Sequence, residues 1–159
     1  MTRTIREVYK LFATGALISL GSMIIVVGIQ VFTRFLMEST PHWTEEAARI
    51  FFIYSVAFGT GTGIRNGDFI RLNLIGKYLS PAPERFLDLV TDLVIVAFSV
   101  ILIIHSLRFV RLGMDEKSPA LEISMGFVFV SMVIIGLAIF IFTLENLRNT
   151  IKGTNHGKL

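Results

Sequence analysis

Two stretches of the sequence run for more than 20 residues without one charged side chain, and this feature constrains the fold more than any other. They are residues 11–33 and residues 123–144. As an α-helix, the first is about 34 Å long, enough to cross a hydrocarbon core of about 30 Å. Only 17% of the chain is charged and 53% is hydrophobic, whereas a soluble domain carries about a quarter charged residues. The sequence therefore predicts an integral membrane protein.

Two shorter uncharged windows, residues 50–64 and 93–107, lie between the long ones. Each would form about 22 Å of helix, so a crossing has to draw the flanking charges into the headgroup region. Residues 11–33 are too long for the apolar part of a signal peptide, and no small-x-small cleavage site follows them. We expect one all-α membrane domain over residues 1–159, with four transmembrane helices. Their approximate limits are 11–34, 45–65, 86–108 and 121–145.

The distribution of lysine and arginine predicts the orientation of these spans. Ten of the 15 lie in the N-terminal segment, in residues 65–85 or in the C-terminal tail, and five lie in the other two connections. The positive-inside rule then places both termini in the cytoplasm. Residues 69–79 have apolar side chains at helical spacing and are too short to cross, so we expect an amphipathic helix in the cytoplasmic interface between spans two and three.

The residues before the second span carry several helix-start signals. Thr44 suits the N-cap, and Glu45 and Glu46 suit the first turn, where the helix dipole favours acids. Both acids are spaced to reach the guanidinium of Arg49 on one helix face. Trp43 stands where an interfacial aromatic belongs, so it is interpreted either as a membrane-surface anchor or as a contact residue for a partner.

The second span ends in a run of small residues. Ser55, Gly59 and Gly63 form one row four residues apart, with Ala57 and Gly61 beside it. In lipid, helices associate by close packing, so this face predicts a tight crossing with another helix. A substrate path is the alternative.

Two proline pairs and a row of acids surround the third span. Ser80–Pro81 and Ser118–Pro119 are each predicted to open a helix, because proline is tolerated in a first turn. Glu84, Asp88 and Asp92 follow at intervals of four and enter the membrane. They are interpreted as a water-facing helix end, a contact with another subunit, or a proton relay.

The residue inventory excludes most chemistry. The chain has no cysteine and three histidines, which do not form a bis-histidine haem site, and it has no phosphate loop, nucleophile elbow or metalloprotease motif. Its net charge of +3 is spread along the chain, which argues against nucleic-acid binding. We expect no enzyme activity and no cofactor. A self-sufficient transporter would need an ionisable residue in mid-span, so the residues alone predict a membrane subunit or scaffold.

Five motifs follow one another along the chain: residues 30–35 (Gln-Val-Phe-Thr-Arg-Phe), residues 43–49 (Trp-Thr-Glu-Glu-Ala-Ala-Arg), residues 59–63, residues 65–68 (Arg-Asn-Gly-Asp) and residues 118–123 (Ser-Pro-Ala-Leu-Glu-Ile). Together they resemble one family, the small membrane subunit (DctQ-like, or Q, subunit) of TRAP transporters, the tripartite ATP-independent periplasmic systems. The resemblance runs from about Leu11 to Glu145. Phe69 and Asn73 depart from the family pattern, and no role is assigned to them.

This resemblance implies a static subunit in a bacterial inner membrane. Its partners would be a large multi-span permease, which carries the substrate and the sodium ions, a periplasmic binding protein, and membrane lipids. The substrate would be an organic acid of the dicarboxylate or sialic acid type. The outer connections would help to dock the binding protein. The alternatives are a freestanding tetraspan structural or assembly protein and a homo-oligomeric small transporter. The residues expected to bind partners or to support the packing are Arg34, Trp43, Glu45, Glu46, Arg49, Gly59, Gly63 and Arg65.

Overall fold

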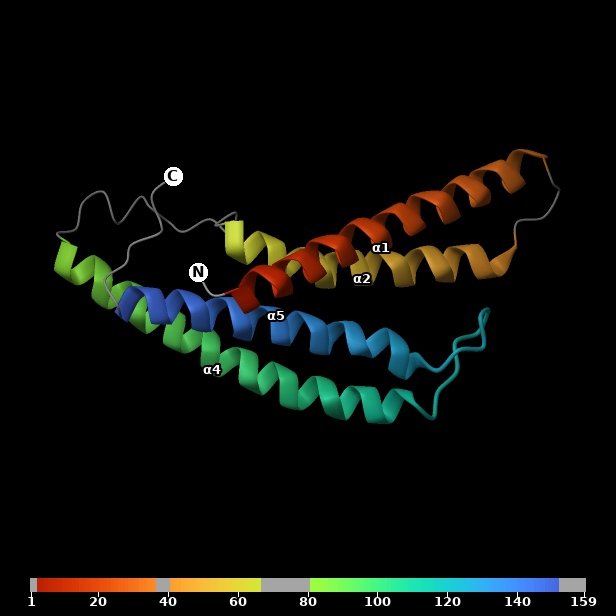
Figure 1. Cartoon of the computed structure of the whole chain (residues 1–159). Coiled ribbons are helices and arrows are strands. Elements are labelled where there is room, and N and C mark those ends of the chain that lie inside the picture. Colours follow the sequence, from red (N-terminus) through yellow and green to blue (C-terminus); the bar gives the residue numbers. More distant parts are fainter. Residues whose placement is uncertain (1–2, 37–40, 67–80, 152–159) are drawn as a thin grey trace.

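A computed structural model of the chain describes residues 3–36, 41–66 and 81–151, and these residues form four helices (Figure 1). All four are long and apolar enough to cross a membrane. The predicted all-α, four-span fold is thereby confirmed. The interfacial helix predicted for residues 69–79 lies outside the described residues. The helices are α1 (Arg3–Leu36), α2 (His42–Asn66), α4 (Pro81–Gly113) and α5 (Met125–Ile151).

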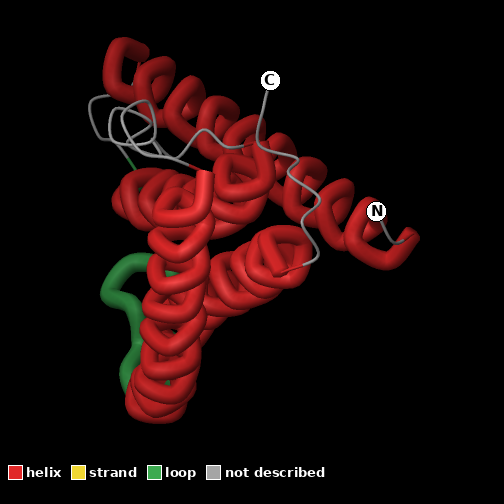
Figure 2. The backbone as a smooth tube through the Cα atoms, turned by 90° about the vertical axis from the view of Figure 1, so that its left-hand side faces the viewer, coloured by secondary structure: helices red, strands yellow, loops and turns green. Residues whose placement is uncertain are grey.

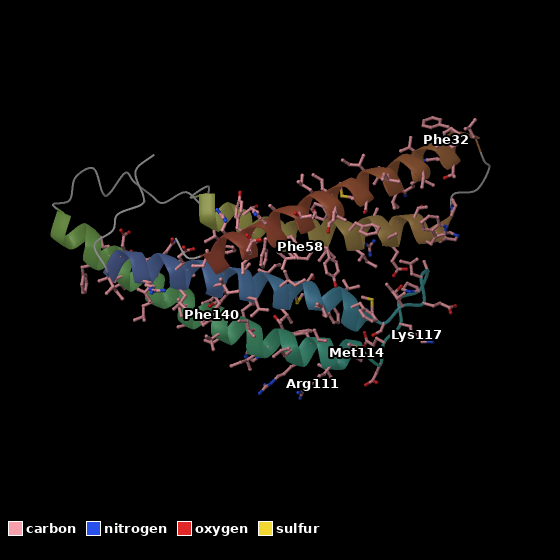
Figure 3. All side chains as sticks on the ribbon, in the orientation of Figure 1. Phe32, Phe58, Arg111, Met114, Lys117 and Phe140 are labelled. Carbon is pink, nitrogen blue, oxygen red and sulfur yellow. The ribbon has the colours of Figure 1, made fainter. Side chains whose placement is uncertain are left out.

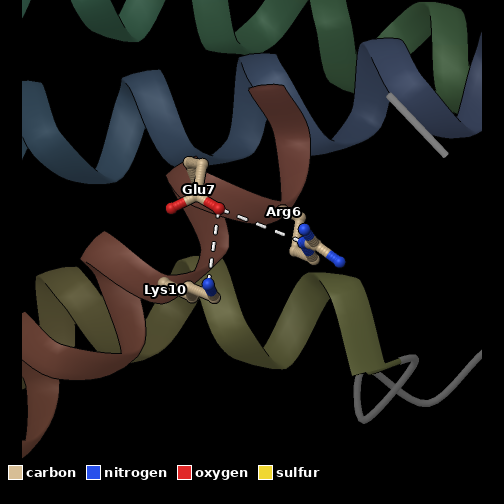
Figure 4. A network of polar contacts seen from close by, with 3 residues as sticks. All are labelled: Arg6, Glu7 and Lys10. Atoms are coloured by element: carbon tan, nitrogen blue, oxygen red, sulfur yellow. Dashed lines mark hydrogen bonds and ion pairs between the residues drawn. The ribbon is translucent and has the colours of Figure 1, made fainter. Parts of the chain in front are cut away.

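The helices α1, α2 and α4 extend beyond their uncharged windows at both ends. The clearest case is α4, which has 33 residues around a window of 15. Helical hydrogen bonds continue through its charged ends, so the short windows need no break in the backbone. At the start of α1, Glu7 pairs with Lys10 at 3.3 Å and with Arg6 at 4.0 Å (Figure 4). These side chains are more than half exposed, so the contacts are ordinary surface pairs.

Two predicted helix starts are wrong, and one is confirmed. The helix α2 begins at His42, and the Thr44 hydroxyl donates to the Pro41 carbonyl at 2.8 Å instead of capping the helix. The last helix begins at Met125, because the residues after Ser118–Pro119 form a hydrogen-bonded loop. Pro81 is the first residue of α4, as predicted.

The four helices form two pairs. The helix α1 packs on α2, α4 packs on α5, and contacts between α2 and α5 join the pairs. Viewed along the bundle, α1 crosses the other helices obliquely (Figure 2). The start of α1 and the end of α5 lie at the same end of the bundle, which we call the termini end (Figure 1). The end of α1, the start of α2 and the connection between α4 and α5 lie at the opposite end, called the loop end.

Three phenylalanine rings fill the place where α1, α2 and α5 meet. Phe12 makes edge-to-face contacts with Phe58 and with Phe142, both at centroid distances of 5.8 Å. A methyl group added at Gly61 would lie 2.6 Å from the Phe12 ring and 3.0 Å from the Phe142 ring. We call these three phenylalanines and Gly61 the aromatic core. Because Gly61 has no side chain, the rings of Phe12 and Phe142 can pack closely against α2.

The close approach predicted for α2 is found, but on a different row of small residues. Ala57 is fully buried and Gly61 meets the rings. A methyl group added at Gly59 would meet no described atom within 4 Å. Within the described residues the close approach therefore uses Gly61, and packing of a partner helix against Gly59 stays a prediction. The reason for the use of Gly61 is the position of the bulky neighbours. The rings of Phe12 and Phe142 pack against Gly61, which lies two residues, or about 200° around the helix, from Gly59.

The α4–α5 pair also packs through glycines. Added methyl groups at Gly113 and Gly136 would come within 3 Å of side chains on the facing helix, and one at Gly126 would come within 3 Å of Met114, the residue directly after α4. Ser99 and Ser131 are buried in the same pair, and their hydroxyls donate to carbonyls of their own helices at 2.7 and 2.6 Å. These two buried hydroxyls are thus satisfied without a bond between the helices.

Candidate functional site

The connection between α4 and α5 is held against the start of α2 by one carboxylate. Oε2 of Glu46 accepts hydrogen bonds from the backbone N–H groups of Ala120 at 3.0 Å and Leu121 at 2.8 Å. Figure 1 shows this connection reaching back toward α2. Ser118, in the same loop, is buried. We call the two hydrogen bonds the Glu46–loop contact; they join residues 74 and 75 positions apart.

The loop itself has a fixed internal structure. The N–H of Ser118 donates to the Ile123 carbonyl at 2.8 Å, and the N–H of Glu122 donates back to the Ser118 carbonyl at 3.1 Å. Glu122 has a φ of 55°, a left-handed conformation that non-glycine residues seldom adopt. The turn aims the two N–H groups of residues 120 and 121 at Glu46.

Ser124 joins the end of α4 to the beginning of α5. Its hydroxyl accepts from the N–H of Gly126 at 3.2 Å, which makes Ser124 the N-cap of α5, and donates to the Gly113 carbonyl at 3.0 Å. The sequence analysis missed this residue, because Ser118–Pro119 carries a helix-start signal of its own. A serine at the second position of the uncharged run 123–144 was the signal that could have identified it.

The acids of α2 do not share one arginine as predicted. Glu45 pairs with Arg49 at 3.2 Å, while Glu46 binds the loop, and no ion pair joins Glu46 to Arg49 in the part of the chain that the structure describes. The side chains of Glu45 and Arg49 are 72% and 67% exposed. This exposure indicates a solvated surface pair.

A second polar bond joins α2 to α5 below the loop. The Tyr54 hydroxyl donates to the backbone carbonyl of Phe127 at 2.6 Å, and the tyrosine ring lies 6.2 Å from the Phe58 ring. The sequence analysis did not select Tyr54, whose spacing on α2 matches no motif. Glu46, Tyr54 and Gly61 thus contact α5, or the loop before it, at three levels along α2.

The eight residues expected to form the site fall into separate groups. Trp43, Glu45, Glu46 and Arg49 lie in the first two turns of α2 at the loop end, and Trp43 is 42% exposed. Arg34 is exposed in the last turn of α1 at the same end. The others, Gly59, Gly63 and Arg65, lie toward the termini end of α2, and the side chain of Arg65 is outside the described part of the structure.

The acidic row before the third span is partly buried. Asp92 is 4% exposed, and Asp88 is half-buried. A water-facing helix end is therefore wrong for Asp92. The side chain of Glu84 lies outside the described residues.

The described residues contain no catalytic or metal-binding constellation. No group of three or more histidine, cysteine, aspartate or glutamate side chains within residues 3–36, 41–66 and 81–151 is placed to hold a metal ion. An open recess at the termini end is lined by Leu144, Leu147, Arg148 and Ile151, which offer no acid–base pair. The polar features at the loop end are structural contacts, and they point to a supporting function.

Comparison with known proteins gives one result. The model of a family described as "Tripartite ATP-independent periplasmic transporters, DctQ component" matches residues 23–153, well over half of the chain. The matched segment includes all of α2, α4 and α5 and the Glu46–loop contact. A search of curated proteins finds no match.

Proposed function

Because the chain belongs to the DctQ family of tripartite ATP-independent periplasmic transporters, we propose that it is the static scaffold that anchors the large permease subunit of such a system. Family membership makes the chain the small transmembrane subunit of a transporter, not an enzyme. It also implies association with a large permease and a binding protein. The static role, the coupling ion and the solute are the parts that we propose.

The observation that carries the static role is the set of three contacts along α2. The Glu46–loop contact, the Tyr54–Phe127 bond and the aromatic core lie at successive levels between Glu46 and Gly61, an axial span of about 22 Å. A hinge between the α1–α2 pair and the α4–α5 pair would have to break all three. Contacts at several depths favour a body that keeps its shape while another subunit moves.

The surface left exposed by these contacts supports an anchoring role. Phe35, Leu17 and Leu112 are between 68% and 83% exposed, and Gly59 offers space for a close neighbour on α2. Helices in lipid associate where small residues allow close approach. We assign the α2 face at Gly59 to contact with the permease, with Arg34, Arg49 and Arg65 supporting the packing. The remaining apolar surface faces lipid.

The transport reaction follows the family. The permease would carry an organic acid, of the dicarboxylate or sialic acid type, into a bacterial cell together with sodium ions that it binds itself. The small subunit would sit in the inner membrane with both termini in the cytoplasm. The loop end would then face the periplasm, where the loop after α4, held by Glu46, would support docking of the binding protein.

A covalent link tests the static role directly, because the chain has no cysteine of its own. Glu46→Cys and Ala120→Cys put thiols at two positions that the Glu46–loop contact holds together, and a short thiol-specific cross-linker then joins α2 to the loop in place of that contact. With permease and binding protein in proteoliposomes, solute uptake should be unchanged by cross-linking. Uptake abolished by the link would overturn the static role. The two single-cysteine variants, treated in the same way, control for modification alone.

Co-purification tests the partners. Tagged chain isolated from native membranes in mild detergent should bring a large permease in equal amount, identified by mass spectrometry. A chain that transports solute alone in proteoliposomes would be a homo-oligomeric transporter. A chain that is recovered without any permease would be a freestanding structural protein. Either result would reject the proposed role.

A further inference from the structure

A row of basic side chains lies on the outer face of α4, near the loop end. His105, Arg108 and Arg111 follow one another at intervals of three, and all are exposed. On an α-helix they fall within about 120° of arc. The buried positions Ser99 and Ser106 lie on the opposite side of the same helix, where α4 packs on α5. The basic row therefore faces away from the bundle, and Figure 3 shows Arg111 pointing outward.

Neither arginine forms an ion pair with a carboxylate among the residues that the structure describes. Among the described residues, the ion pairs are Arg6–Glu7, Lys10–Glu7 and Arg49–Glu45. Arg108 directly follows the uncharged window 93–107, and Arg111 lies in the last turn of α4. This position puts both guanidinium groups within about 8 Å of the helix end, at the level of lipid headgroups. Lipid phosphates at that depth are available as counter-ions for both charges.

Large apolar side chains share the same face. Ile101, Ile104 and Leu112 alternate with the basic row and are between 49% and 68% exposed. The row spans about 9 Å along the helix axis, and the helix axis runs roughly parallel to acyl chains. The face thus offers cations toward the headgroups and aliphatic surface toward the hydrocarbon.

We propose that this face of α4 binds an anionic phospholipid, such as phosphatidylglycerol, in the leaflet at the loop end. The guanidinium groups of Arg108 and Arg111 donate to the phosphodiester, which matches their paired N–H geometry. His105 lies deeper and donates to an ester carbonyl. The acyl chains lie against Ile101 and Ile104. Two cations without an ion pair among the described residues favour a lipid with net negative charge over a zwitterionic one.

Native mass spectrometry of the full chain tests the proposal. The chain is purified in mild detergent with any subunit that co-purifies, and is titrated with phosphatidylglycerol or with phosphatidylcholine. We expect the double variant Arg108→Gln/Arg111→Gln to bind phosphatidylglycerol about tenfold more weakly, because it loses two charge-assisted donors. Phosphatidylcholine should bind the wild-type chain several-fold more weakly than phosphatidylglycerol does.

Two matched variants make the result specific. Lys117→Gln removes one positive charge at the same end but outside the row, and it should leave the binding of phosphatidylglycerol within about twofold. Arg108→Lys/Arg111→Lys keeps the charge but loses the paired N–H geometry, so it should bind phosphatidylglycerol more tightly than the double glutamine variant and more weakly than the wild-type chain, which separates the site from any change in folding. Unchanged binding in the double glutamine variant would overturn the proposal. Loss of a co-purified protein with lipid binding unchanged would also overturn it, and would assign the face to a protein contact.

Discussion

The aromatic core and the Glu46–loop contact both join α2 to the second half of the chain, but they do so by different physics. The aromatic core is apolar and depends on shape, since Gly61 leaves room for the rings of Phe12 and Phe142. The Glu46–loop contact is polar and depends on direction, since one carboxylate oxygen receives two backbone N–H groups. The first lies deep in α2, and the second lies in its first two turns.

The difference teaches which interaction suits which depth. Within the hydrocarbon region, apolar burial gives no preference for helix over lipid, so close packing decides which helices meet. Near the headgroups, water competes for polar groups, and a carboxylate that accepts two N–H bonds still orders a loop. We therefore expect core substitutions to change the stability of the bundle, and Glu46 substitutions to change mainly the loop.

The largest effect is expected at Gly61. Gly61→Leu would place a side chain where even one methyl group lies 2.6 Å from the Phe12 ring. Overpacking of this kind costs about 1–3 kcal/mol or more. The measurement is thermal unfolding of the chain in detergent micelles, followed by circular dichroism. Gly59→Leu is the matched control, because nothing lies within 4 Å of an added methyl group there, and its stability should change by less than about 0.5 kcal/mol. Equal destabilisation by the two variants would contradict the assignment of the core row.

The next effect is expected at Glu46. Glu46→Ala removes the acceptor for the N–H groups of Ala120 and Leu121, so both amides should exchange with deuterium several-fold faster, while exchange in α2 and α5 stays the same. Glu45→Ala is the control, because its carboxylate pairs with Arg49 and not with the loop. If the loop exchanged no faster in the Glu46 variant, the loop would hold its shape without α2. The Glu46–loop contact would then not be the polar counterpart of the aromatic core.

How much of this was predictable depends on the range of each interaction. The four helices follow from uncharged windows, which are local properties of the chain, and the structure confirms them. Helix ends were less predictable. Ser118–Pro119 has a local helix-start signal, but the structure places Ser118 and the following residues in a loop whose partner is Glu46, 74 positions from Ala120. Residue spacing is a local property, so it cannot predict a contact between residues that lie so far apart in the sequence.

The same reason explains the errors in the candidate site. Residue spacing correctly predicted the ion pair between Glu45 and Arg49. It also predicted an ion pair between Glu46 and Arg49, but the Glu46 carboxylate accepts hydrogen bonds from the loop amides instead. On α2, one row of small residues runs through Gly59 and another through Gly61, and helical spacing is compatible with packing of either row against a neighbouring helix. The choice of the Gly61 row depends on where the bulky rings of α1 and α5 lie, and helical periodicity on α2 alone contains no information about that.

A smaller effect is expected at Tyr54. Tyr54→Phe removes the hydroxyl that donates to the Phe127 carbonyl and keeps the ring near Phe58. The expected loss of stability is about 0.5–1.5 kcal/mol, measured by thermal unfolding. Thr60→Val is the control, since its hydroxyl donates within α2 to Val56, and it should cost less. A Thr60 variant that costs as much as the Tyr54 variant would show that the bond to Phe127 adds nothing to the joining of α2 and α5.

The smallest effect is expected for the Glu45–Arg49 pair, and it tests the depth argument most directly. Both side chains are about two-thirds exposed or more, and an exposed pair at this spacing contributes about 0.3–0.5 kcal/mol. A double-mutant cycle of Glu45→Gln and Arg49→Gln, measured by thermal unfolding, should give a coupling energy in that range, and the coupling should fall as salt is added. A coupling above about 1 kcal/mol that resists salt would mean that the pair lies in a low-dielectric region. The first turns of α2 would then lie deeper in the membrane than the Glu46–loop contact requires, and depth would no longer separate the polar contact from the apolar one.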